Sequence, residues 1–173
     1  MNALAAGIQV LIALAFVSIP VIRARWGAAA QSAAEGELTR QGVPTTVLAE
    51  NKLRFDAGGH ETAAPVGIAA VLVVVAALNL LDSPLGETLT WIVQPLVILI
   101  NGAILYSQLT AVRAVEGAFA KRNDPVLRRI DVPAFLTAAE KAFPAWVFPS
   151  AQNVRHTIAF AGSAAVLVLM TLS

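Results

Sequence analysis

The two histidines, His60 and His156, are the side chains in this sequence best suited to holding a cofactor. Imidazole nitrogens are common ligands of haem iron and of transition metals, and Asp56 and Glu61 lie close enough to His60 along the chain to complete a metal site. Each histidine precedes a long apolar stretch, whereas haem-anchoring membrane subunits usually bury their ligands inside such stretches. We therefore expect both histidines to meet water or lipid headgroups and expect no cofactor or metal, with a haem or quinone at their level as the alternative.

Motifs for catalysis are missing from the sequence. Gly58-Gly59 is not followed by the lysine and hydroxyl residue of a phosphate-binding loop, and no Gly-x-Ser-x-Gly nucleophile turn occurs. The carboxylates Glu35 and Glu37 lie on a polar stretch, which predicts exposure to solvent rather than a pocket. Cysteine is absent, which excludes disulfides, thiolate metal sites and a cysteine nucleophile. The sequence therefore predicts a protein that is not an enzyme.

The composition is that of a membrane protein. Of 173 residues, 57% are hydrophobic and 13% charged, and the mean hydropathy is +0.71. Soluble domains carry about 25% charged residues, so a soluble domain is excluded on this ground, and a disordered chain even more clearly. The net charge of +1 also argues against nucleic-acid binding, which requires a basic face.

Four apolar segments are long enough to cross a bilayer as helices. About twenty residues at 1.5 Å each span roughly 30 Å, the thickness of the hydrocarbon core. We expect a single membrane domain, 1–173, and an all-α fold with spans at about 3–22, 63–81, 87–109 and 155–172, joined by cytoplasmic connections 23–62 and 110–154. Because Arg23 and Arg25 follow the first segment and no base precedes it, we expect an uncleaved signal anchor rather than a secretory signal peptide.

The basic residues are distributed unevenly among the connections. All twelve lie within residues 23–62 and 110–156, while the short turn at residues 82–88 carries Asp82 and Glu87 and no base. Cytoplasmic loops are enriched in lysine and arginine. We therefore expect both connections in the cytoplasm of a bacterium, both termini outside, and a multi-pass protein of the inner membrane.

Helical structure is expected to extend beyond the spans. Residues 28–38 have the composition of a helix that continues the first span, and helical spacing after the third span persists to Lys121. Asp131-Val132-Pro133 resembles a helix start, with aspartate at the N-cap and proline in the first turn. Alternation over residues 51–56 also permits a short strand.

Polar residues are few inside the uncharged parts of the expected spans, which are residues 3–22, 63–81, 89–109 and 157–172. Asn79, Gln94 and Asn101 are expected to make hydrogen bonds between helices, as is Gln9. An ion or substrate path is the alternative, but such paths usually contain ionisable groups. Asn79 and Gln94 both lie near the outer end of their spans and are expected to meet, and Pro95 should kink the third span.

An aromatic segment precedes the last span. Residues 132–143 predict a helix with one apolar face, and a run rich in aromatic residues and proline follows it. On the basic side of a membrane such a segment is typical of an interfacial cytoplasmic helix, and a docking surface for a partner protein is the alternative. The residues expected to contact lipid headgroups or a partner are Arg128, Arg129, Phe135, Phe143, Trp146 and Phe148.

In size and composition the whole chain is similar to small accessory subunits of actinobacterial envelope complexes, such as lipid-import ABC-type transporters and respiratory supercomplexes. The similarity implies a non-enzymatic subunit that stabilises or regulates a larger membrane complex, with lipid transport as its process. Its partners would be membrane lipids and other integral membrane subunits. A membrane anchor of a respiratory redox complex and a small autonomous carrier are the alternatives, and the absence of charged residues inside the spans disfavours the carrier.

Overall fold

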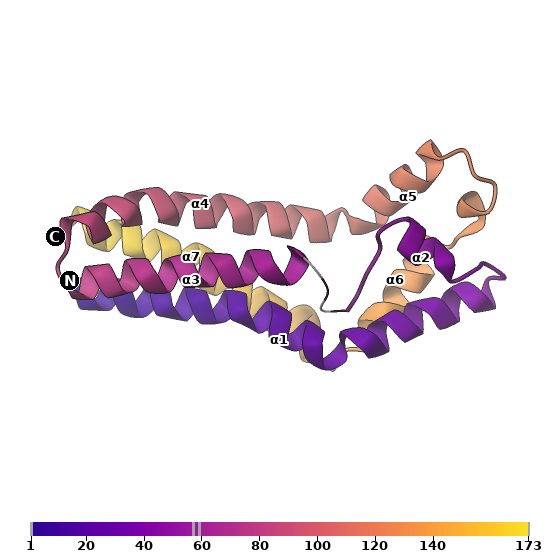
Figure 1. Ribbon diagram of the computed structural model, residues 1–173, viewed down its shortest axis with the longest axis horizontal. Coiled ribbons are helices and arrows are strands. Elements are labelled where there is room, and N and C mark those ends of the chain that lie inside the picture. Colours follow the sequence, from indigo (N-terminus) through magenta and orange to yellow (C-terminus); the bar gives the residue numbers. More distant parts are fainter. Residues whose placement is uncertain (1, 57, 59, 173) are drawn as a thin grey trace. The chain divides into compact units, whose positions relative to one another are not determined.

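The computed structural model describes residues 2–56, 58 and 60–172, and every regular element among them is helical (Figure 1). The chain divides into two compact units. Unit 1 comprises Met1–Val21, Gly59–Leu105 and Ser150–Ser173, and unit 2 comprises Ile22–Gly58 and Tyr106–Pro149. Unit 2 is compact because the connections contain enough apolar residues to build a core of their own.

The helices are as follows: α1 (Asn2–Arg40), α2 (Thr46–Glu50), α3 (His60–Leu80), α4 (Pro84–Leu109), α5 (Ala111–Lys121), η1 (Leu127–Arg129), α6 (Val132–Lys141), η2 (Val147–Ala151) and α7 (Gln152–Thr171). The first span does continue as one helix to Arg40, as the sequence predicts. Helical structure after the third span also reaches Lys121, with a break at Thr110. The described residues of 51–56 form no strand.

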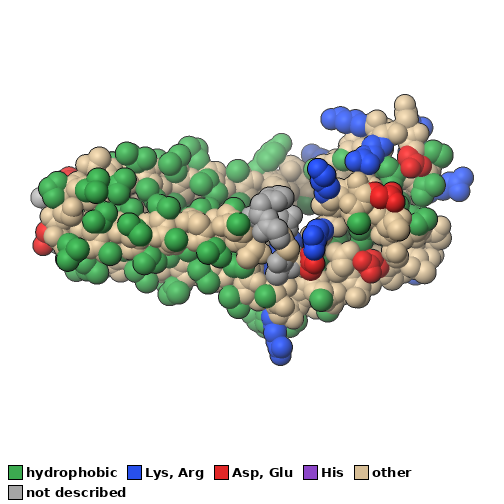
Figure 2. All heavy atoms as spheres, in the orientation of Figure 1, with side chains coloured by type: hydrophobic (Ala, Val, Ile, Leu, Met, Phe, Trp, Pro, Cys, Tyr) green, Lys and Arg blue, Asp and Glu red, His purple; other side chains and the backbone are tan. Residues whose placement is uncertain are grey.

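Unit 1 consists of the apolar parts of α1, α3, α4 and α7, which lie side by side (Figure 1). Ile12, Phe16, Leu72, Val97 and Ala159 are buried together at its centre. The described residues contain four helices long and apolar enough to cross a membrane, which confirms the expected all-helical class. On the face shown in Figure 2, these helices present mostly hydrophobic side chains.

The turn between α3 and α4 is short. The backbone N–H of Ser83 donates to the carbonyl of Leu78, and Asp82 adopts a positive φ of 50°. The side chain of Asn2 donates a 2.7 Å hydrogen bond to Asp82, so the start of α1 lies beside this turn. Gly86 then packs against the last turn of α3, where a Cβ atom would come within 2.8 Å of the Asn79 and Leu78 backbones.

Unit 2 has a core contributed by several short elements. Leu38 of α1, Leu48 of α2, Phe119 of α5 and Phe135 of α6 are almost completely buried within it. Asp131 caps α6 by accepting a hydrogen bond from the backbone N–H of Ala134, which confirms the helix start predicted from the sequence. The expected interfacial helix is therefore part of this core.

Candidate functional site

A line of polar side chains runs along the inner face of α4. The buried residues of this helix recur every three or four positions, which places them on one face. Three of them are polar: Thr90, Gln94 and Asn101. On α7, His156 and Ser163 are seven residues apart and both buried, so both helices turn polar groups toward the interior of unit 1.

Gln9, Asn79 and Thr90 form the Asn79 cluster at one end of this line. Asn79 Nδ2 donates to Thr90 Oγ1 at 2.8 Å and to Gln9 Oε1 at 3.0 Å, and Gln9 Nε2 donates to Thr90 Oγ1 at 3.1 Å. Thr90 Oγ1 in turn donates to the carbonyl of Gly86. The cluster joins α1, α3 and α4, and all three side chains are at most 3% exposed. Such interhelical bonds hold membrane helices together.

Thr90→Val should destabilise unit 1 by about 1–2 kcal/mol, because it leaves donors of Gln9 and Asn79 buried without an acceptor. The control is Thr88→Val, two residues away. Thr88 makes the same kind of bond to a carbonyl four residues back, but it is exposed and bonds no other helix among the described residues, so little change is expected. The free energy of unfolding of both variants can be measured in a graded detergent mixture. An equal loss of stability in the two variants would contradict an interhelical role for Thr90.

His156 and Asn101 form the His156 pair farther along the line. His156 Nδ1 lies 2.9 Å from Asn101 Oδ1, and His156 is 5% exposed. The expectation that His156 meets water or headgroups is therefore wrong, because α7 begins before this residue and turns it into the bundle. The side chains of His60 and Glu61 lie outside the described residues. Asp56, which the sequence offered as a further metal ligand near His60, forms a salt bridge with Arg54.

Gln94 does not meet Asn79 as the sequence suggested. Asn79 bonds Gln9 and Thr90 instead, because Thr90 is one turn closer to the α3–α4 turn than Gln94 is. Gln94 is fully buried, and neither polar atom of its side chain has a hydrogen-bond partner among the described residues. Gln94 therefore lies on the polar line without taking part in either group.

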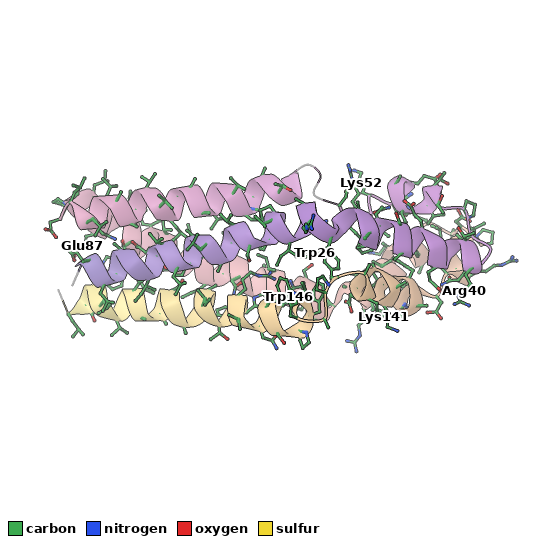
Figure 3. All side chains as sticks on the ribbon, turned by 90° about the horizontal axis from the view of Figure 1, so that it is seen from below. Trp26, Arg40, Lys52, Glu87, Lys141 and Trp146 are labelled. Atoms are coloured by element: carbon green, nitrogen blue, oxygen red, sulfur yellow. The ribbon has the colours of Figure 1, made fainter. Side chains whose placement is uncertain are left out.

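Four aromatic residues of unit 2 pack in two edge-to-face pairs. Trp26 and Trp146, both labelled in Figure 3, have ring centroids 5.7 Å apart and planes at 83°, and the rings of Phe143 and Phe148 are 5.4 Å apart. Trp146 is 53% exposed and Phe148 37%, so both retain surface for another molecule. Phe135 was expected to have such surface as well, but it is fully buried in the core of unit 2 and cannot contact lipid or a partner.

The described bases are concentrated in unit 2, with Arg155 as the exception. Arg128 and Arg129 are exposed, and Arg128 donates to the side-chain oxygen of Asn123. Arg23 donates to the carbonyl of Arg54 at 2.8 Å. Lys and Arg side chains also appear over unit 2 in Figure 2, on the face shown there.

The Arg54–Asp56 pair predicts a pH dependence in unit 2. Arg54 donates from Nε and from an Nη atom to the two oxygens of Asp56, and these bonds lower the pKa of Asp56 from its ordinary value of 3.8. A lowered folded-state pKa means that the pair stabilises the fold above pH 3.8 and loses this contribution as the pH falls through the folded pKa.

In Arg54→Gln the pKa of Asp56 should rise toward 3.8, because the charged hydrogen bonds are gone. A carbon-detected NMR titration of the carboxyl group measures it. Arg40→Gln, which removes a base that pairs with Glu37, should leave the Asp56 titration unchanged. A midpoint for Asp56 that is the same with and without Arg54 would refute the pairing.

Sequence reasoning found part of the polar line and missed the rest. It selected Asn79, Gln94 and Asn101 because amides stand out in apolar spans. It missed Thr90 and Ser163, since hydroxyl residues are common in membrane helices and often bond their own backbone. The sequence did contain a signal for them: Thr90 lies four residues before Gln94, and Ser163 seven residues after His156, so each pair shares one helix face.

Comparison with known proteins gave no match to any family model, curated protein or solved structure. We therefore infer function from the geometry and surface of the chain itself.

Proposed function

We propose that the protein is a four-span integral membrane subunit without enzymatic activity that stabilises or regulates a larger bacterial envelope complex. The main support for this proposal is the distribution of polar and apolar side chains in unit 1. Each of its helices exposes large apolar side chains, among them Leu14, Val74, Leu99 and Val168, all more than 55% exposed. Polar groups lie inside instead, as in the Asn79 cluster, which is the arrangement suited to lipid surroundings.

The charge distribution supports an orientation. Asp82 and Glu87 belong to the α3–α4 turn and the start of α4, and Glu87 lies at one end of unit 1 in Figure 3. Nearly all lysines and arginines belong to unit 2. By the positive-inside rule unit 2 faces the cytoplasm, and both termini lie outside the inner membrane.

A subunit of a larger complex needs a surface that binds its partners, and unit 2 has exposed residues suited to this role. Trp146 and Phe148 are exposed apolar groups on this unit, and Arg128 and Arg129 are exposed bases there. Aromatic residues and arginine are enriched where proteins bind one another and where they meet lipid headgroups. Among complexes, a lipid-import ABC-type transporter is our first candidate, on the strength of the chain's size and composition.

Purification of the tagged full chain from its native membrane in mild detergent tests this function. We expect other integral membrane proteins to accompany it in fixed stoichiometry by mass spectrometry. The double variant Arg128→Gln/Arg129→Gln should co-purify with less of these membrane proteins. The control Arg113→Gln/Lys121→Gln, which removes two other exposed bases of unit 2, should co-purify with the same amount. A monodisperse monomer without companions would refute the subunit role and favour an autonomous protein.

A further inference from the structure

Four side chains inside unit 1 carry buried polar atoms without a hydrogen-bond partner among the described residues. The atoms are Thr62 Oγ1, Gln94 Nε2, Gln94 Oε1, Asn101 Nδ2 and Ser163 Oγ. Gln94 and Ser163 are 0% exposed and Asn101 is 2% exposed, so bulk water does not reach them. A buried polar group left unpaired costs about 1–3 kcal/mol. Where two such groups lie at one level of the bundle, they therefore call for a ligand between them.

Helix geometry places Gln94 and Ser163 at the same depth. Gln9, near the start of α1, bonds Thr90 at the start of α4, and Ala5, nearby on α1, packs with Met170 at the end of α7. Helices α4 and α7 are therefore antiparallel.

The His156 pair fixes the register of these two helices. Gln94 precedes Asn101 by seven residues, and Ser163 follows His156 by seven. Seven residues rise about 10.5 Å along a helix, and in an antiparallel pair both steps go in the same direction. Gln94 and Ser163 therefore face the bundle interior two turns from the contact between Asn101 and His156, at one level.

The chemistry of the unpartnered atoms selects a small neutral ligand. Gln94 offers two donor hydrogens and an acceptor oxygen, and the hydroxyl of Ser163 offers both functions. The charged residues of unit 1 lie toward the ends of its helices, so no opposite charge is placed at this depth for an ion. Water donates and accepts, and a buried water typically makes about three hydrogen bonds.

We propose that Gln94 and Ser163 form a binding site for water inside unit 1. Because the two side chains lie at one level and neither has a hydrogen-bond partner among the described residues, bound water there satisfies both. Asn101 lies two turns away, beside His156, and is not part of this site. The bundle interior then holds a hydrated polar site between the Asn79 cluster and the His156 pair.

Water-edited solid-state NMR of the full chain in lipid bilayers tests the site. The experiment measures how fast proton magnetisation passes from water to glutamine side-chain amides, and Gln94→Leu identifies the signal of Gln94. Gln9 is the matched control in the same spectrum, because it is also 0% exposed but has its amide bonded to Asn79 and Thr90. We expect transfer to Gln94 to be several-fold faster than to Gln9.

The companion variant is Ser163→Ala, which removes one partner of the bound water. Transfer to Gln94 should fall toward the rate of Gln9, while an unshifted Gln9 signal reports that the bundle is intact. Equal rates at Gln94 and Gln9 in the natural sequence would overturn the proposal, as would a Gln94 rate that Ser163→Ala leaves unchanged.

Discussion

Gly86→Ala should destabilise unit 1 by about 2–3 kcal/mol, one of the two largest effects that we expect from a single substitution. A Cβ atom at this position would lie 2.7 Å from Asn79 Oδ1, 2.8 Å from the Asn79 nitrogen and 2.8 Å from the carbonyl carbon of Leu78. Two of these three atoms are backbone, so relief requires that α3 and α4 move apart. Because Thr90 is one turn away, this movement also strains its bond to Asn79.

Gly102→Ala is the control for this substitution. Gly102 lies on the same helix, and a Cβ atom there would meet nothing within 4 Å. Replacing a helical glycine by alanine favours the helix by roughly 0.5–1 kcal/mol, so this variant should be neutral or more stable. Unfolding of both purified variants in detergent, followed by circular dichroism, gives the comparison. A Gly86→Ala variant as stable as Gly102→Ala would show that α3 and α4 do not pack closely here.

Gly27→Ala should have the second large effect, about 1–3 kcal/mol in unit 2. A Cβ atom on Gly27 would lie 2.5 Å from the carbonyl oxygen of Phe55 and 2.8 Å from the Asp56 Cα atom. The loop that contains Arg54 and Phe55 is hydrogen-bonded to α1 before and after Gly27. Arg23 donates to the carbonyl of Arg54, and Gln31 Oε1 accepts from the backbone N–H of Phe55. Making room for the methyl group therefore breaks at least one of these bonds.

Gly36→Ala provides the matched substitution on α1, since nothing lies within 4 Å of the added atom. Near-ultraviolet circular dichroism is a suitable readout, because Trp26 adjoins Gly27 and packs against Trp146. We expect Gly27→Ala to change this signal and lower the unfolding midpoint. Gly36→Ala should leave the signal unchanged and the midpoint unchanged or higher. Identical spectra and midpoints for the two variants would contradict the close contact between the loop and α1.

Much of the fold follows from the sequence because membrane spans are recognised by length and charge alone. Uninterrupted apolar runs predicted the four long helices, and the Asp131–Pro133 pattern predicted the start of α6. The compact unit 2 was not predicted. Its core joins residues such as Leu38 and Phe119, which are far apart in the chain, and pairing at that distance leaves no local pattern.

The site was predicted less completely for a related reason. Asn79 and Asn101 were selected by residue type, but their partners Gln9, Thr90 and His156 depend on helix register. Phe135 illustrates the opposite error. An apolar helix face beside a membrane has the same sequence pattern whether it meets lipid or a protein core, and here it meets the core.

The most direct test of the account is the membrane topology of the chain. The sequence contains no cysteine, so single cysteines can be introduced at exposed positions without background labelling. Glu87→Cys places one at the start of α4, and Ser32→Cys places one on the part of α1 that belongs to unit 2. Both are treated with a membrane-impermeant maleimide in spheroplasts. We predict labelling of Glu87→Cys in intact spheroplasts and of Ser32→Cys only after permeabilisation; the reverse pattern, or equal labelling of both, would contradict four spans with unit 2 in the cytoplasm.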